Sequence, residues 1–471
     1  MSGVCAQKSD PADAITRRCA LVIAALSSFL PPFMAASINI ALPAIGAEFS
    51  MDAVLLGWIA TSYLLAAAVF LIPFGRLADI HGMKKIFVIG LAVYTIASLL
   101  SAVAPSANIL IAVRIIQGIG SAMLFSTGTA ILICLFPPHE RGKVLGINVA
   151  FVYLGLSLGP VLGGFLTQSF GWRSIFLVNV LLGLIVLALV LWKLKGEWAA
   201  ASGEKFDLIG SAIYSLMLIC VMCGFSLLPE AVGWSLFFLG LLSLIALIKW
   251  ESMTDSPVLD IDLFRTNRVF AFSNLAALIN YSATFAAGFL LSLYLQYIKG
   301  LSPQEAGAIL IAQPLVMAIF SPIAGRLSDR IEPRIIASAG MALTLLGIIP
   351  FVFLDFQTSI SYIVGVLVIL GLGLALFSSP NTNAIMSSIQ RRSYGVGSAT
   401  LASMRLVGQA LSMGVAMLVF AYYIGRVEIM PENYSLFLQS TQTAFIIFSA
   451  LCFLGIFASL ARGEVRSHQK N

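Results

Sequence analysis

Long apolar stretches separated by short polar segments dominate this chain. A helix needs about 20 apolar residues to cross a bilayer, and about fourteen stretches here approach or exceed that length. Barrel strands are shorter and alternate in polarity, so helices are predicted instead. The predicted spans are 19–46, 55–74, 86–104, 108–136, 144–166, 174–194, 208–228, 234–250, 269–297, 306–324, 335–353, 360–382, 396–423 and 437–461.

A short charged segment recurs in the two halves of the chain. The segment Gly75–Lys85 follows the second predicted span, and Gly325–Arg334 follows the tenth with the same Gly-Arg-Leu-x-Asp start. Matching segments in two halves indicate a duplicated membrane bundle. The predicted fold is therefore an all-α polytopic membrane protein, with two six-helix bundles related by pseudo-symmetry plus two extra helices.

The repeat also divides the chain, because the seventh and eighth spans have no counterpart in it. The predicted parts are a cytoplasmic N-terminal tail (1–18), an N-terminal six-helix bundle (19–194), a linker with two extra transmembrane helices (195–268), a C-terminal six-helix bundle (269–461) and a cytoplasmic C-terminal tail (462–471).

Composition and charge agree with a membrane protein. The chain is 59% hydrophobic and 10% charged, whereas soluble domains are about 25% charged. Lys and Arg collect in alternate loops, which by the positive-inside rule places both termini in the cytoplasm of a plasma-membrane protein. The net charge of +6 is thus a topology signal, and no nucleic-acid partner is expected. The expected partners are the lipid bilayer and a small-molecule substrate, with the protein a monomer.

Other classes of function find little support. The hydrophilic start precedes an apolar stretch too long for a signal peptide, so no cleavable signal is expected. Cys220 and Cys223 read as small buried hydrophobes, and the three histidines fall in predicted cytoplasmic segments. No metal, nucleotide-binding loop or catalytic group is predicted. The protein is expected not to be an enzyme, and to use an ion gradient, with protons as the expected ion, in place of a cofactor.

The recurring segment supplies the first candidate site, a gating turn. Gly75 and Gly82 permit a tight reversal at the membrane face. Asp79, repeated as Asp329, could pair with a helix end or an arginine as a gating latch. The alternative is that the segment only anchors the topology. The candidates are Gly75, Arg76, Asp79, Gly82, Lys84, Gly325, Arg326 and Asp329.

Arg114 and Arg405 are the charges predicted well inside spans. A charge in hydrocarbon is costly and usually marks a functional cavity or a partner. Gln117 shares a helix face with Arg114. The three are candidates for coupling or for binding substrate; the alternative is that the arginines satisfy backbone carbonyls or reach the interface. No Asp or Glu is placed within a span, so the cavity should disfavour cations and favour neutral or anionic substrates.

The fifth span has a glycine face. Gly155, Gly159 and Gly163 are four residues apart, which lets another helix approach closely, while Pro160 can bend the helix and Gly164 follows directly. Generic helix packing is the alternative to a moving interface. Other polar residues are candidates for lining the cavity or for joining helices: Asn39, Tyr63, Asn280, Tyr281, Gln313, Asn381 and Asn383.

These motifs resemble those of the major facilitator superfamily, and specifically its fourteen-span drug:proton antiporter branch. The first turn, Arg114–Gly120, Gly155–Gly164, Asn39–Pro43 and Trp172–Phe176 are similar to its signatures. The resemblance implies rocking bundles, with the fifth helix at their interface. Members that export cationic drugs often carry an Asp early in the first span. Here Phe33–Ile38 contains no acid.

The resulting prediction is a secondary-active transporter that exports a small, drug-like organic molecule by alternating access, with proton antiport. The first alternative is uptake or exchange of a neutral or anionic metabolite, because a fold does not set the direction of transport. The remaining alternative is a non-transporting membrane enzyme or sensor.

Overall fold

The computed structural model describes residues 11–137, 140–194, 196–199, 206–228, 230–254, 261–390 and 394–463. Over these residues the chain forms helices and connecting loops, without a strand. Fourteen segments are long and apolar enough to cross a membrane. The predicted all-helical fold with fourteen spans is therefore confirmed.

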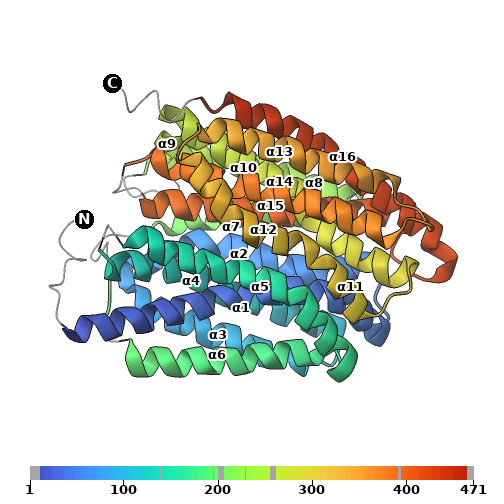
Figure 1. The fold of residues 1–471 in the computed structure, drawn as a ribbon, viewed down its shortest axis with the longest axis horizontal. Coiled ribbons are helices and arrows are strands. Elements are labelled where there is room, and N and C mark those ends of the chain that lie inside the picture. Colours follow the sequence, from blue (N-terminus) through green and yellow to red (C-terminus); the bar gives the residue numbers. More distant parts are fainter. Residues whose placement is uncertain are drawn as a thin grey trace.

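Two bundles lie side by side, with the first in blue to green and the second in yellow to red (Figure 1). The first bundle contains α1 (Pro11–Phe49), α2 (Ala53–His81), α3 (Met83–Ala102), α4 (Ala107–Leu135), α5 (Arg141–Phe170) and α6 (Arg173–Lys193). Between the bundles in sequence come α7 (Leu208–Leu227), α8 (Ala231–Glu251) and the short α9 (Ile261–Thr266).

The second bundle begins with α10 (Arg268–Leu293). Its helices are α10, α11 (Pro303–Leu310), α12 (Ala312–Ser328), α13 (Pro333–Ile348), α14 (Ile360–Ser387), α15 (Tyr394–Tyr423) and α16 (Tyr434–Ala461). Short π and 3₁₀ segments at Tyr294–Ile298, Ile349–Phe353 and Pro431–Asn433 extend α10 and α13 and precede α16.

The tenth span, predicted over 306–324, extends from Pro303 to Ser328. It consists of α11 and α12, which meet at Ile311. Pro314 has no N–H to donate to the carbonyl of Leu310, so the regular hydrogen-bond ladder cannot continue through this point. Ser302 caps α11, with Glu305 returning the bond in a capping box.

The packing of helices repeats between the bundles. In the first bundle α1 packs on α5, α4 on both α2 and α3, and α3 on α6. In the second, α10 packs on α15, α14 on both α12 and α13, and α13 on α16. Each pair in the second bundle is the counterpart of a pair in the first, eight spans later. The duplication inferred from the recurring segment thus extends to the packing.

The bundles meet along α2 with α15 and along α5 with α11 and α12. We call the membrane end where α2 and α12 finish the basic face, and the end where α1 finishes the opposite face. Near the opposite face the Ala53 amide donates to the Val427 carbonyl at 3.2 Å. There too, Ser292 donates to the Asn39 carbonyl at 2.7 Å and Gln296 to the Ile40 carbonyl at 3.0 Å. The two bundles are therefore held together at this end.

Candidate functional site

Arg114 lies in a closed polar network inside the first bundle. Its side chain is fully buried, and its Nε donates to the Ile59 carbonyl of α2 at 3.1 Å. One terminal nitrogen donates to Gln117 Oε1 at 2.6 Å, and the guanidinium lies 4.4 Å from the Tyr63 ring centroid. Gln117 in turn donates to Ser98 Oγ of α3 at 2.8 Å. Neutral groups from three helices thus surround this cation.

This environment favours a structural role for Arg114 in this conformation. The predicted pairing with Gln117 is present, but neither side chain reaches solvent. Within the described part of the chain no carboxylate pairs with the guanidinium. Of the two alternatives for Tyr63, lining the cavity or joining helices, this conformation favours the second, because this buried side chain bonds to Ser121 Oγ at 2.6 Å inside the bundle. An aromatic face and a hydroxyl make Tyr63 a partner for the network.

Arg405 has a different environment on α15. Its side chain is half-buried, and its guanidinium carbon lies 6.0 Å from the Phe125 ring of α4 in the other bundle. Among the described residues, no carboxylate forms an ion pair with it. An accessible arginine between the two bundles can bind an anionic or electron-rich group.

A cluster of hydroxyl groups also joins the bundles. Tyr153 of α5 and Tyr281 of α10 each lie 3.5 Å from Ser378 Oγ of α14, and all three are half-buried. Tyr281 was among the cavity candidates, whereas Ser378 was not singled out. A serine in an apolar helix has no distinctive sequence signal, so this meeting point required the fold.

The remaining cavity candidates separate into different environments. Asn39 is 9% exposed, with its Nδ2 4.0 Å from where a side chain on Gly288 of α10 would begin, so it lies between the bundles. Gln313 is half-buried near the start of α12. Asn280 and Asn381 are at most 1% exposed. Asn381 donates to the Ser273 carbonyl at 3.1 Å, whereas neither amide atom of Asn280 has a partner among the described residues.

Asn383 is not a cavity residue in this structure. It donates to Ser328 Oγ at 2.8 Å and to an Asp329 carboxylate oxygen at 3.2 Å. Both acceptors lie at the basic end of α12. Asn383 therefore ties α14 to the second gating turn, and the cavity assignment is corrected.

The first gating turn is shorter than predicted. Gly75, Arg76 and Asp79 lie within α2, so the reversal depends on Gly82, whose φ of 116° disfavours a residue with a side chain. The prediction that Gly75 makes the reversal is wrong, because α2 continues regularly to His81.

A residue that the sequence analysis missed caps the next helix. One oxygen of Glu197 accepts the Lys84 amide at 2.8 Å and the Lys85 amide at 3.4 Å. The Met83 amide donates to the Trp198 carbonyl at 2.7 Å. Glu197 follows α6, more than a hundred residues away, so only folding brings it to this helix N-terminus, where a negative charge is favourable. Lys84 thus contributes its backbone amide to this cap, in addition to the positive charge of its side chain.

The second turn is built without such a glycine. Gly325 and Arg326 lie within α12, and Asp329 follows its last residue. Pro333 then begins α13, because its fixed φ suits the first helical position. The recurring sequence therefore makes two different turns.

The glycine face of α5 mainly packs within its own bundle. Gly155 lies against the Phe29 carbonyl, Gly159 against Ala36 and Gly163 against Ser37, all on α1. For these three glycines the contacts favour generic helix packing over a moving interface. They serve the α1–α5 contact, which Ser37 reinforces by donating to the Gly159 carbonyl at 2.9 Å.

Another part of α5 does meet the second bundle. The Pro160 carbonyl lies against Gly307 of α11, and Gly164 lies against the Pro303 carbonyl. A side chain at Gly164 or Gly307 would collide with backbone, so this approach requires glycine. Pro160 and Gly164 are thus the interface residues of the antiporter motif.

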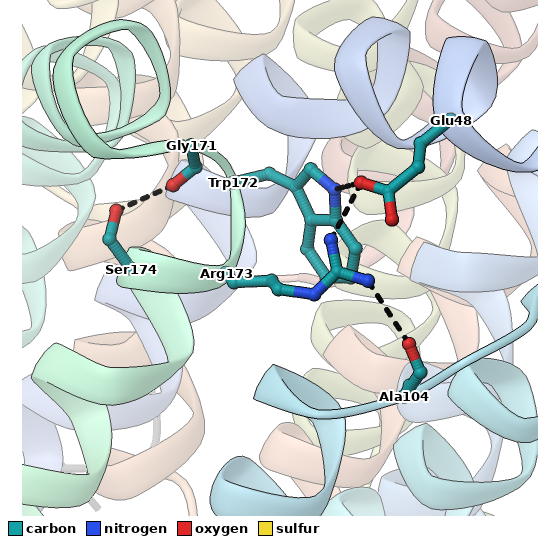
Figure 2. Close-up of polar contacts among 6 residues, drawn as sticks. All are labelled: Glu48, Ala104, Gly171, Trp172, Arg173 and Ser174. Atoms are coloured by element: carbon teal, nitrogen blue, oxygen red, sulfur yellow. Dashed lines mark hydrogen bonds and ion pairs between the residues drawn. The ribbon is translucent and has the colours of Figure 1, made fainter.

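At the opposite face a charged cluster fastens the first bundle (Figure 2). Glu48 of α1 accepts from Trp172 Nε1 at 2.7 Å and from Arg173 at 2.6 Å. Arg173 also donates to the Ala104 carbonyl at 3.3 Å and lies 4.3 Å from the Trp172 ring. The Trp172–Phe176 motif therefore joins α1, the α3–α4 loop and α6.

Arg462 is a buried cation that the sequence analysis assigned to the C-terminal tail. It is fully buried and donates to the Ser459 carbonyl at 2.8 Å and to its hydroxyl at 2.5 Å. Burial lowers the pKa of Arg462 to about 10. The bundle thus extends to this residue. No group of three His, Cys, Asp or Glu side chains in the described part of the chain is placed to hold a metal ion.

Two repeated six-helix bundles, with polar groups between them and fourteen spans in all, define a polytopic membrane transporter. The chain belongs to the Major Facilitator Superfamily, whose family model matches residues 24–249 and 274–471. This membership identifies a transporter rather than an enzyme.

Relatives whose names refer to transport, export or drug resistance align with most of the chain. It is 30% identical to the riboflavin transporter RibZ of Clostridioides difficile, over 93% of this chain and 95% of the relative. It is 32% identical to the cephamycin export protein CmcT of Amycolatopsis lactamdurans, over 86% and 85%. It is 30% identical to the multidrug resistance protein Stp of Mycobacterium tuberculosis, over 87% and 77%.

Solved structures share the fold. A bacterial homologue of the human lysosomal transporter Spinster, in an inward-facing and unoccupied conformation, matches with a TM-score of 0.68 at 16% identity, over 98% of this chain and 99% of the other. A peptide transporter, POT, in complex with sulfate, matches with a TM-score of 0.67 at 14% identity, over 95% and 98%.

Proposed function

We propose that this transporter exports a small drug-like organic molecule, neutral or anionic, across the plasma membrane by alternating access. The observation that carries the proposal is Arg405, a half-buried cation between the bundles with no carboxylate partner among the described residues. A positive charge held there repels a cationic solute and attracts an anionic one. The nearby aromatic ring of Phe125 suits a solute with an apolar body.

The contacts between the bundles support a rocking mechanism. They hold the opposite face together through α1, α2, α10 with its π segment, and the loop that follows α15. If the basic face is cytoplasmic, as the charge pattern predicts, this conformation faces inward. Asp79 and Asp329 are the proposed latches that would form when the basic face closes. Asp329 is already bonded to Asn383, so closure would exchange one polar partner for another.

Proton antiport is the proposed driving reaction, by resemblance to the antiporter branch. No Asp or Glu is predicted inside a span, so the sequence offers no carboxyl group there as an evident proton carrier. A proton carrier would then be an acid near a membrane face or an acidic group of the substrate itself. The second possibility fits an anionic substrate, because its protonated form is neutral.

A second candidate is uptake or exchange of a neutral or anionic metabolite. The observation that favours it is the match to a riboflavin transporter over nearly the whole of both chains. The names of other relatives, an antibiotic exporter and a multidrug resistance protein, favour export. The same cavity chemistry serves both candidates, so the direction of net transport distinguishes them.

The test is transport by purified protein in liposomes with an imposed pH gradient. Anionic, neutral and cationic aromatic dyes of similar size are compared in each gradient direction. We expect the anionic or neutral dyes to cross the membrane in the direction opposite to proton flow. Their rate should be about tenfold that of the cationic dye. Empty liposomes and a protonophore are the controls. Rapid transport of the cationic dye would contradict the proposal that Arg405 repels cations. Movement of a dye in the same direction as protons would favour the uptake candidate.

A further inference from the structure

The extra helix α7 lies along a seam between the two bundles. It packs against α2 of the first bundle, against α15 of the second and against α8. On α15, Gly414 lies within 3.5 Å of Met222 and Phe225 of α7, measured from where its side chain would begin. The extra pair therefore does more than lengthen the linker, since α7 contacts both moving bodies.

One hydroxyl of α7 bonds both bundles at once. Tyr214 Oη donates to the Ala68 carbonyl of α2 at 3.1 Å and lies 2.6 Å from Ser403 Oγ of α15. Because its one proton is directed to Ala68, the Ser403 hydroxyl donates to Tyr214. Tyr214 is 3% exposed and Ser403 is 1% exposed. Water cannot readily replace either bond at this depth, so both contribute to the stability of the seam.

Other polar contacts of the extra pair are less suited to this role. Trp58 of α2 donates to Ser226 of α7 at 2.7 Å, which joins α7 to the first bundle alone. Glu230 pairs with Arg426 at 3.1 Å, but both side chains are more than half exposed. An exposed ion pair contributes little because water and salt screen it. Tyr214 is therefore the contact that links the three elements.

We propose that Tyr214 is a positioning residue that fastens the α2–α15 seam and so biases the transporter toward this conformation. The inference rests on the alternating access proposed above. The bridge forms only in states where the Ala68 carbonyl and the Ser403 hydroxyl reach the same oxygen. Rocking of the bundles changes that spacing, so the bridge stabilises some states over others. Ser403 also lies two residues before Arg405, so the bridge restrains the segment of α15 that carries this cation.

The test measures conformation without substrate. Spin labels are placed at Leu191→Cys of α6 and Phe457→Cys of α16, which are 64% and 56% exposed near the basic face, one in each bundle. The native cysteines are replaced by alanine, and the distance distribution is measured in lipid bilayers by pulsed electron resonance. Tyr214→Phe keeps the ring and removes the bridge. Ser403→Ala removes one partner. Ser215→Ala is the control, since that hydroxyl bonds within α7 to the Ser211 carbonyl.

We expect Tyr214→Phe to change the ratio of the two distance populations by about three- to tenfold, the effect of one buried hydrogen bond. Ser403→Ala should shift it in the same direction, the double variant no further than Tyr214→Phe, and Ser215→Ala not at all. No shift in Tyr214→Phe, a shift in only one of the two variants, or an equal shift in Ser215→Ala would overturn the proposal. The measurement uses neither substrate nor gradient, so failure of the export assay leaves it interpretable.

Discussion

The two bundles share one arrangement of helices but differ in how they treat polar side chains. In the first bundle, Arg114 and Gln117 are fully buried and bonded to neutral groups of neighbouring helices. In the second, Arg405 is half-buried and faces the other bundle, and Asn280 is fully buried with no partner for its amide in the described part of the chain. A duplicated scaffold has thus diverged in its polar interior.

The difference suggests that the polar interiors of the two bundles serve different purposes. A closed network of hydrogen bonds rigidifies the helices that contribute to it, which suits a bundle that moves as one body. A cation between the bundles suits contact with a solute. The position of an arginine within a span therefore does not by itself define its role, because burial and partners decide whether it stabilises the bundle or binds substrate. Equivalent substitutions at polar residues of the two bundles should therefore have different effects on stability and transport.

The largest effect on stability is expected from Arg114→Met. This change leaves the Gln117 oxygen and the Ile59 carbonyl without their buried donor, and should lower the free energy of unfolding by about 2–5 kcal/mol. Reversible unfolding in detergent measures it. Arg405→Met is the matched control and should cost less than about 1 kcal/mol, since Arg405 makes no buried hydrogen bond with the described residues. Equal losses in the two variants would contradict the comparison.

A companion substitution sharpens the interpretation of Arg114. Replacing both members of a buried polar pair with apolar residues often costs less than removing one. The double variant Arg114→Met with Gln117→Leu should therefore recover part of the lost stability. A further loss in the double variant would show that the network is coupled more widely, through Ser98 and Tyr63.

Arg405→Met should have its main effect on transport. Removing a charge-assisted contact to an anionic substrate should reduce uptake into proteoliposomes about tenfold or more, while the protein remains folded. Arg405→Lys keeps the charge without the planar guanidinium and should retain intermediate activity. The contrast between an anionic and a neutral dye measures how much of the loss is electrostatic. Unchanged transport of the anionic dye would remove Arg405 from the proposed site.

The sequence allowed the spans and their duplication to be predicted because these depend on strong local signals. The length of a span follows from the hydrophobic thickness of the bilayer, and Gly82 has a positive φ, a conformation that favours glycine in a tight turn. The pairing of Arg114 with Gln117 followed from helical spacing. The division of the tenth span at Ile311 was not predicted, because the apolar run obscured the effect of Pro314.

Tertiary contacts account for what could not be predicted. Helical spacing places Gly155, Gly159 and Gly163 on one face, yet it does not say which helix packs there, and that helix proved to be α1. Glu197 reaches the start of α3 only through the fold. Tyr63 and Asn383 are polar residues in apolar helices, so the sequence signal for a cavity residue is the same as that for a structural partner.

Asn280→Leu offers the finest test of the comparison, with the smallest expected change. An amide buried without partners contributes no hydrogen bond, so replacing it with an apolar side chain of similar size should leave the free energy of unfolding within about 1 kcal/mol or raise it. Gln117→Leu, in the first bundle, is the control and should be destabilising, because Arg114 and Ser98 lose a partner. A destabilised Asn280→Leu would show that this amide is paired in solution, and the contrast between the bundles would then narrow to the two arginines. A stable variant with slowed transport would instead assign the amide to the transport cycle, where a partner is met only in another conformation.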